Sequence, residues 1–290
     1  MTNEPDRSTP APDIRVDPAL GTVVHVVGHR QNRPNLPTNV DRNRCPFCPG
    51  GLEAPDHYDV RWFTNRWPAM PDDRCEVVLY SPDHDTSLAS LEPSHLTRLV
   101  DLWAERSEAL GGRPDVDYVL VFENRGSTVG ATISHPHGQI YAYDHVPDRP
   151  ARVLASRPSI SEDRTIHVDE HWVSYVPWAP VHPTAVSISP RRPCGRLSDL
   201  TREERVALAH VLVSTCRRLD ALFDTPLPYM MWIDQRPYDD SLPEAVLSIE
   251  FVSPWREREL PRYVAAAELA AGEFFNPVVP EDLAARLRRL

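Results

Sequence analysis

The apolar positions of this chain recur with two different periods. Over residues 93–110 and 201–223 they return every three or four positions, which is the pattern of an amphipathic helix. Each of these segments leads into an almost continuous apolar run, at 118–124 and 229–235, which is typical of a buried strand. The pattern therefore predicts two long helices, each followed by a strand of the core.

The same order of elements occurs twice, at an offset of about 110 residues. Strand-like segments at 61–63 and 77–82 are echoed by segments at 171–173 and 185–190. The repeating unit is strand, strand, helix, strand, strand. Its two copies predict an α+β fold with a largely antiparallel sheet and flanking helices, fused into one body.

We expect this repeat to divide the chain into an N-terminal half, residues 14–155, and a C-terminal half, residues 156–290. Residues 1–13 are polar and rich in proline, so they predict a disordered tail. At the other end, residues 261–290 predict a helix, a turn and a terminal helix.

The composition argues against several classes of protein. A formal net charge of −11 disfavours a general nucleic-acid binder, because such proteins need a basic surface to displace counterions. No apolar run reaches membrane-spanning length, and the N-terminus lacks the charged-then-apolar pattern of a signal peptide. The five cysteines do not form a secreted disulfide framework. We therefore expect a cytoplasmic protein without a nucleic-acid or membrane partner.

Every fixed side-chain cation is an arginine, since the sequence contains no lysine. This excludes a Walker A lysine, a Schiff-base lysine and a lysyl-nucleotide intermediate. Covalent chemistry on a phosphate group would need another nucleophile, and histidine is the obvious candidate.

One short motif supplies such a histidine. The run Ser-His-Pro-His-Gly-Gln-Ile places His135, His137 and Gln139 at alternate positions, so in a strand all three side chains point to one face. His137 could attack phosphorus, with Gln139 beside it to hydrogen-bond the phosphoryl oxygens. A pair of purely structural strand histidines is the alternative. The second copy carries Ser248 at the position of His137, which predicts one catalytic and one structural half.

A second constellation indicates a metal site. Cys45 and Cys48 form a CxxC pair on a tight turn, which could chelate one soft or borderline cation, serve redox chemistry or have no such role. A closed zinc site needs two more ligands, and the repeat offers His84 and His135. We predict a Cys₂His₂ zinc site over an empty one. Metal bound to His135 would fix the aim of His137 two residues later.

Taken together, the motifs resemble the galactose-1-phosphate uridylyltransferase family, a duplicated branch of the histidine-triad superfamily. The resemblance covers residues 20–285 and rests on six motifs in chain order: Gly28–Pro34, Cys45–Cys48, Phe63–Asn65, Ser81–His84, Phe122–Gly126 and His135–Ile140. It implies a duplicated histidine-triad-like fold. The zinc and the nucleophile would belong to the N-terminal half, and the C-terminal half would hold a degenerate site.

The resemblance also implies a reaction. Family members move UMP from UDP-glucose to galactose 1-phosphate in ping-pong fashion, through a nucleotidyl-histidine that matches His137. Triad hydrolases keep a third histidine where this chain has Gln139, and a neutral amide cannot readily protonate a leaving group. Transfer to a sugar 1-phosphate is therefore favoured. A nucleoside-diphosphate-sugar phosphorylase or hydrolase of the same fold, with another base or acceptor, is the alternative. A zinc-stabilised nucleotide binder without turnover is disfavoured, because binding alone needs neither His137 nor Gln139.

Further site residues are implied by the same resemblance. The family's zinc ligands match Cys45, Cys48, His84 and His135, and its subunits form a homodimer with shared active sites. The substrate-binding positions are two arginines expected on phosphate and four residues expected around the nucleotide: Arg30, Arg33, Asn65, Glu123, Asn124 and Thr132. A salt-bridged surface is the alternative for the arginines, and a strand-ending role is the alternative for Glu123 and Asn124.

Three departures from the family pattern concern specificity. Many members carry a second, iron-type site on an HxHxF strand, which reads Leu247–Phe251 here, so we expect no second metal. The family's Asn-Asp pair is Asn65-Arg66 in this chain, and Ala265–Ala267 stand where a tyrosine is usual. The last two changes leave the fold and the covalent chemistry intact, but they leave open which sugar and which base the protein uses.

Overall fold

The computed structural model describes residues 13–32 and 44–290, and its centre is one nine-stranded sheet. The strand order is β3-β4-β6-β5-β10-β11-β9-β8-β7, and all neighbours pair antiparallel, which confirms the predicted fold class. The strands are β3 (Arg61–Thr64), β4 (Cys75–Leu79), β5 (Tyr118–Arg125), β6 (His137–Tyr143), β7 (Thr165–Val168), β8 (Trp172–Tyr175), β9 (Thr184–Pro190), β10 (Tyr229–Asp234) and β11 (Ser248–Ser253).

The sheet displays the predicted duplication. From the centre outward, β5, β6, β4 and β3 on one side correspond to β10, β11, β9 and β8 on the other. The two copies join at the β5–β10 pair, where Phe122 lies opposite Trp232. Strand β7 lies outside this symmetry. The boundary between residues 155 and 156 stays a prediction. The tail predicted for 1–13 lies outside the described residues except for Asp13, which begins a strand.

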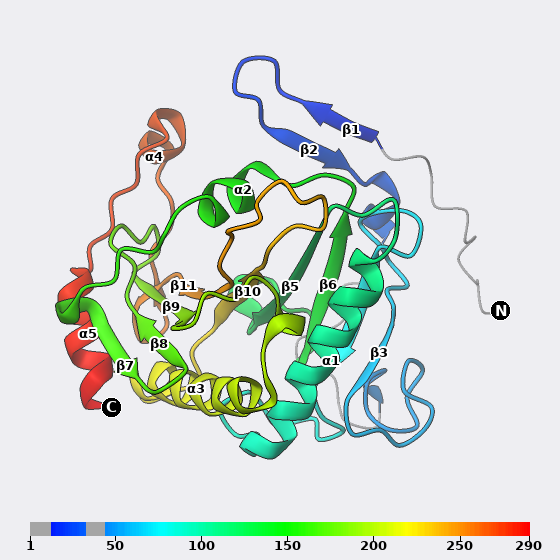
Figure 1. Cartoon of the computed structure of the whole chain (residues 1–290), viewed down its shortest axis with the longest axis horizontal. Helices are drawn as coiled ribbons and strands as arrows, with labels where there is room; N and C mark the ends of the chain where they lie inside the picture. The colour runs from blue at the N-terminus through cyan, green and yellow to red at the C-terminus, as the bar shows by residue number, and fades with distance from the viewer. Residues whose placement is uncertain (1–12, 33–43) are drawn as a thin grey trace.

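Two long helices cover one face of the sheet, side by side (Figure 1). Helix α1 (Pro93–Gly111) begins with a proline, and α3 (Arg202–Ala221) begins with a capping box in which Thr201 and Glu204 satisfy each other's backbone N–H. Both helices match the predicted periodicity, and the apolar stripe of α1, including Trp103, is buried in the main core.

The strand that carries the histidine motif is pressed closely onto this core. Its residues Ile140 and Ala142 face the helices and are fully buried, so His137 and Gln139 point to the opposite face. A Cβ on Gly138 would lie 2.2 Å from the Tyr80 hydroxyl oxygen, so only glycine fits there. The backbone of β6 is thereby held at a fixed depth beneath the site.

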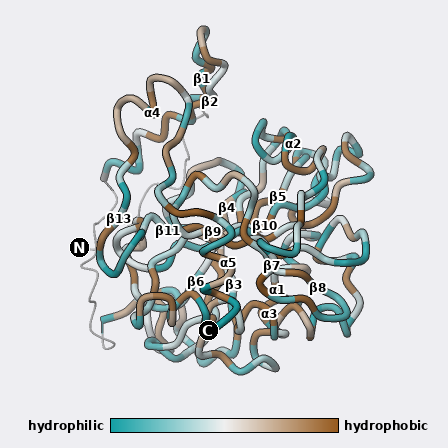
Figure 2. Tube along the Cα trace, turned by 90° about the vertical axis from the view of Figure 1, so that its left-hand side faces the viewer, coloured by the Kyte–Doolittle hydropathy of each residue, from teal (hydrophilic) through white to brown (hydrophobic). Residues whose placement is uncertain are grey.

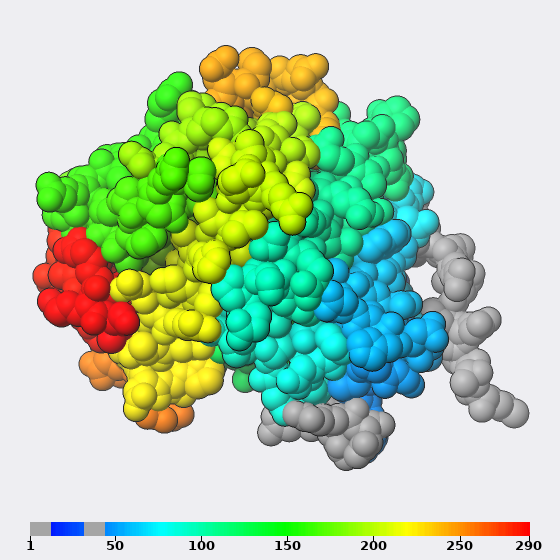
Figure 3. Space-filling view, turned by 60° about the horizontal axis from the view of Figure 1, so that its bottom comes forward, coloured from blue at the N-terminus to red at the C-terminus, as the bar shows by residue number. Residues whose placement is uncertain are grey.

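The shorter helices are α2 (Asp148–Leu154), α4 (Ala266–Ala271) and α5 (Pro280–Arg289), of which the sequence pattern predicted the last two. Helix α5 packs against β7 and contributes Leu283 and Leu287 to the main core; it is the red patch of Figure 3, beside the yellow α3. In the part of the chain that the structure describes, no helix has the length and apolarity needed to cross a bilayer.

Two small projections stand out from the body in Figures 1 and 2, and the sequence pattern predicted neither as such. One is the hairpin of β1 (Asp13–Val16) and β2 (Val23–Val26). The other, which we call the C-terminal arm, is residues 258–279 and contains α4. It begins directly after β12 (Trp255–Glu257) and includes β13 (Leu260–Pro261), which pairs with β12.

Candidate active site and metal centre

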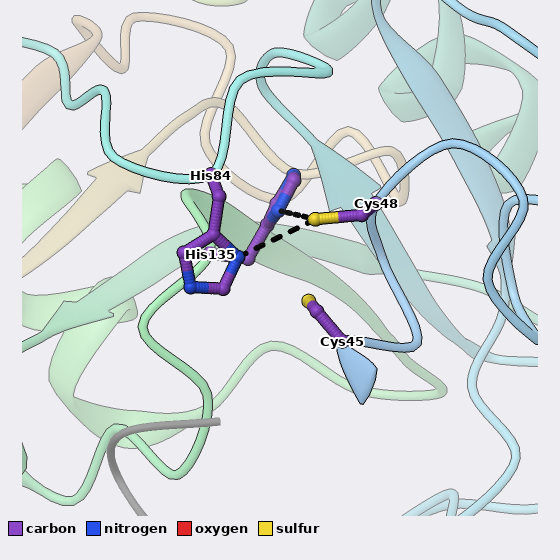
Figure 4. Close-up of side chains that lie close together, drawn as sticks. All are labelled: Cys45, Cys48, His84 and His135. Atoms are coloured by element: carbon purple, nitrogen blue, oxygen red, sulfur yellow. Dashed lines mark hydrogen bonds between the residues drawn. The ribbon is translucent and has the colours of Figure 1, made fainter. Parts of the chain in front are cut away.

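Four side chains from three separate segments meet at one end of β6 (Figure 4). The ligand atoms of Cys45, Cys48, His84 and His135 all lie within 4.8 Å of one another. The Cys48 sulfur is 3.4 Å from Nδ1 of His84 and 3.6 Å from Nδ1 of His135. A tetrahedral ion at roughly 2.3 Å from sulfur and 2.0 Å from nitrogen separates the two atoms by roughly 3.5 Å. The cluster therefore fits a single metal ion, and it contains the four residues predicted from sequence.

The two cysteines are presented by a tight turn. Gly50 has φ +86°, a left-handed conformation that favours glycine, and a Cβ on Gly51 would lie 2.6 Å from the Cys45 carbonyl oxygen. Behind this turn, Phe47 and Tyr58 pack with Leu79 of β4 in a small apolar cluster. The two glycines that follow the CxxC are therefore required by the shape of the turn.

The outer nitrogens of the two histidines are already bound. His135 Nε2 lies 2.8 Å from the Ser81 carbonyl oxygen and 2.8 Å from the Tyr58 hydroxyl, and His84 Nε2 lies 3.1 Å from Ser134 Oγ. A carbonyl only accepts, so His135 carries its proton on Nε2 and turns the Nδ1 lone pair toward the cysteines. Burial lowers the pKa of His135 to about 4, which keeps the imidazole neutral, as a metal ligand must be.

His135 also orients the ring of the neighbouring histidine. His137 Nδ1 lies 2.7 Å from the backbone carbonyl oxygen of His135, so Nδ1 donates its proton there. The lone pair of His137 is then on Nε2, the nitrogen that faces away from the backbone. The ring of Phe47, from the metal-binding turn, packs against His137 with centroids 5.1 Å apart. A neutral imidazole held in one tautomer is suited to nucleophilic attack.

The amide of Gln139 is held in one orientation by its neighbours. Asn65 Oδ1 accepts from the backbone N–H of Trp67 at 2.9 Å, which leaves Asn65 Nδ2 to donate to Gln139 Oε1 at 3.2 Å. Tyr141 donates its hydroxyl to the same oxygen at 3.4 Å. Because both contacts occupy the carbonyl oxygen, the Gln139 NH₂ group remains as the donor for an anionic ligand.

Tyr141 is a site residue that the sequence analysis missed. It stands two residues after Gln139 on the same face of β6, and this alternation is the signal that could have found it. Burial raises the pKa of Tyr141 to about 12, and a hydrogen bond with Arg30 opposes the rise. Tyr141 thus connects the predicted phosphate-binding Arg30 to the amide of Gln139.

A cavity of about 470 Å³ opens beside the nucleophile. Its lining includes hydroxyl, amide and guanidinium groups together with the histidine: Ser87, Asn124, Arg125, Ser127, Ser134 and His137. The structure thus brings the predicted Asn124 and His137 to one cavity. Thr132 lies in the loop directly before β6, and Arg33 lies outside the described residues.

The side chains of Glu123 and Arg66 make contacts away from the ones expected of their motifs. The carboxyl of Glu123 lies in the core on the helix side and accepts a hydrogen bond from the Tyr229 hydroxyl at 3.2 Å, although the residue also lines the cavity beside His137. Burial raises its pKa to about 7. Arg66, which follows Asn65, is paired with Glu53 at 3.0 Å.

Comparisons with family models and with known proteins all identify the same family. Residues 66–147 match the model described as galactose-1-phosphate uridyl transferase, N-terminal domain, and residues 127–289 match the corresponding C-terminal domain. A galactose-1-phosphate uridylyltransferase of Thermotoga maritima is 33% identical over 95% of this chain and 98% of its own length.

Solved structures show the same fold. One titled "Structure of uridylyltransferase" is 27% identical with a TM-score of 0.79, and the match covers 95% of this chain and 97% of that one. An ADP-glucose phosphorylase of Arabidopsis thaliana is 23% identical with a TM-score of 0.75, covering 97% of this chain and 99% of that one. At this identity the second likeness concerns the fold alone.

The orientation of Gln139 leads to a prediction. Tyr141→Phe removes one donor to Oε1, and the loss of a hydrogen bond of about 1 kcal/mol should lower kcat roughly fivefold. KM and the melting temperature should change little. Tyr143→Phe, two residues further along the same face, is the matched control for steady-state kinetics. Full turnover in Tyr141→Phe would show that the amide is held without this hydroxyl.

Proposed function

Because the chain belongs to the galactose-1-phosphate uridylyltransferase family and is a transferase, we propose that it moves UMP from a UDP-sugar to a sugar 1-phosphate through His137. The observation that carries this proposal is the hydrogen bond from His137 Nδ1 to the His135 carbonyl, at 2.7 Å. It puts the ring's lone pair on Nε2, the nitrogen that we propose attacks the α-phosphorus.

In each step of the proposed reaction, one bond to the α-phosphorus forms and one breaks. His137 Nε2 forms a bond to the α-phosphorus while the bond to the departing sugar 1-phosphate breaks. A phosphate oxygen of a second sugar 1-phosphate then attacks the same phosphorus, and the P–N bond breaks. The Gln139 NH₂ donates to a non-bridging oxygen throughout, and Arg30 supplies positive charge beside it.

UDP-glucose labelled at the α-phosphate tests the nucleophile. We expect the label to become attached to the intact protein and to survive base but not acid, as a phosphoramidate does. His137→Ala should stay unlabelled, whereas His145→Ala, at an exposed position beyond β6, should label normally. Equal labelling of His137→Ala would assign the nucleophile to another residue.

The labelled protein also identifies the acceptor. We propose galactose 1-phosphate or a related sugar 1-phosphate, and we expect one of these to discharge the label faster than inorganic phosphate or water. Fastest discharge by phosphate would make the protein a phosphorylase, and fastest discharge by water would make it a hydrolase.

We propose zinc as the ion of the Cys45, Cys48, His84 and His135 cluster. Two thiolates and two neutral imidazoles in a closed tetrahedral arrangement suit zinc and provide no open position for a substrate. Its role would be structural: it would tie the CxxC turn to His135, and so to the carbonyl that orients His137. None of the five cysteines, all of which lie in the described part of the chain, is in a disulfide, which fits a reducing compartment, and we infer a cytoplasmic protein.

Metal analysis tests this site. We expect about one zinc per chain in the purified protein, with Cys48→Ser losing zinc and melting at a lower temperature. Cys194→Ser, which removes a buried thiol elsewhere, is the control that should keep its zinc. Active wild-type protein without bound metal would exclude the site.

We propose that the chain forms a homodimer through the C-terminal arm, residues 258–279. The arm exposes large apolar side chains, with Tyr263 81%, Leu269 72% and Phe275 68% exposed. It is nonetheless held in one shape, because Glu268 is buried, pairs with Arg262 and accepts the backbone N–H of Phe275 at 2.7 Å. A rigid apolar projection of this kind is typical of an interaction surface.

Light scattering after size-exclusion chromatography tests the dimer. We expect the wild type and Val206→Glu, at a partly exposed position on α3, to elute as dimers. Leu269→Glu should elute as a monomer, because it places a charge in the proposed interface. A monomeric wild type at micromolar concentration would refute the proposal.

A further inference from the structure

A second cavity, of about 460 Å³, lies over the strands of the C-terminal half, on the face of the sheet that carries His137 in the other half. Ile249 and Phe251 of β11 face the helices, so Ser248 and Glu250 point to the opposite face. β11 pairs with β10 and β9 as β6 pairs with β5 and β4. Ser248 and Glu250 thus take the places of His137 and Gln139.

The floor of this cavity is rich in groups that hydrogen-bond neutral hydroxyls. Ser187 and Ser189 of β9 lie beside Ser248 and Glu250 of β11. Ser248 Oγ is buried and has no hydrogen-bond partner among the described residues. A buried hydroxyl without a partner costs free energy, and a bound ligand or water would relieve that cost.

The charges at the floor disfavour a phosphorylated ligand. Arg149 is shared between two carboxylates, at 3.2 Å from Asp234 and 2.9 Å from Glu250, so its guanidinium is neutralised. Asp234 is fully buried, and it also accepts from the Trp232 indole N–H at 3.1 Å. With two carboxylates to one arginine, the cavity has the wrong charge for an anion such as a phosphate group.

The rim of the cavity is apolar, in contrast to its polar floor. Trp178 is 70% exposed there, and Pro177, Pro180 and Val181 surround it. Its indole offers a flat apolar platform at the mouth of a polar cavity. The volume lies within the range of roughly 300–1,000 Å³ that small-molecule sites occupy.

We propose that this second cavity binds an uncharged, hydroxyl-rich ring, that is, a monosaccharide without a phosphate group. The apolar face of the ring would stack on Trp178. Its hydroxyls would donate to Glu250 and exchange hydrogen bonds with Ser187, Ser189 and Ser248. This site is separate from the nucleotidyl-transfer site and stands or falls independently of it.

Saturation-transfer NMR with D-galactose and D-glucose tests the proposal on the full-length protein. We expect saturable binding of at least one of the two sugars, about tenfold weaker in Trp178→Ala and severalfold weaker in Ser248→Ala. Both variants should remain folded, because Ser248 Oγ has no hydrogen-bond partner among the described residues and Trp178 is largely exposed.

Gln139→Ala and inorganic phosphate are the controls that separate the two sites. Binding should be unchanged in Gln139→Ala and unaffected by phosphate. Three results would each overturn the proposal: no saturable binding of either sugar, equal binding in Trp178→Ala, or binding that is lost in Gln139→Ala.

Discussion

The active site depends on one short hydrogen bond inside the histidine motif, from His137 Nδ1 to the carbonyl oxygen of His135. It joins two functions that are carried by residues two positions apart on the same backbone. The side chain of His135 belongs to the metal cluster, and its carbonyl selects the tautomer of His137. Any movement of the cluster is therefore transmitted to the nucleophile through two peptide units, without a separate positioning residue.

Packing on the helix-facing side of β6 keeps the hydrogen bond between His137 and His135 in place. Gly138 lets Tyr80 approach the backbone of β6, and Ile140 and Ala142 pack into the helix layer. Alternation along a strand assigns chemistry to one face and packing to the other. The buried carboxyl of Glu123 is the exception, since it carries an ionisable group into the packed face beside Tyr229.

Much of this architecture could be predicted from the sequence, because it depends on periodicity and spacing. The bounds of α1 and α3 follow from the apolar stripe, and the metal cluster follows from a CxxC pair with two histidines in repeated positions. The orientation of Gln139 could not be predicted, since it depends on Asn65 and Tyr141 reaching the same oxygen across the sheet.

Sequence motifs were least informative about side-chain position where two adjacent strand residues point to opposite faces of the sheet. Glu123 and Asn124 are adjacent in the motif and both line the cavity with His137, yet the carboxyl of Glu123 accepts its hydrogen bond from Tyr229 in the core, because successive side chains of a strand alternate. The C-terminal arm escaped prediction for a different reason: its shape depends on the buried Glu268, a contact that has no periodic signature.

The central pairing of β5 with β10 has a consequence for how such a protein evolves. Separating the two halves there would expose two strand edges, each with a row of unpaired N–H and C=O groups ready to aggregate. Each half therefore covers the exposed strand edge of the other. This pairing requires the backbone of the second half to be kept, whereas it places no demand on the side chains at the positions of His137 and Gln139, which are Ser248 and Glu250 there.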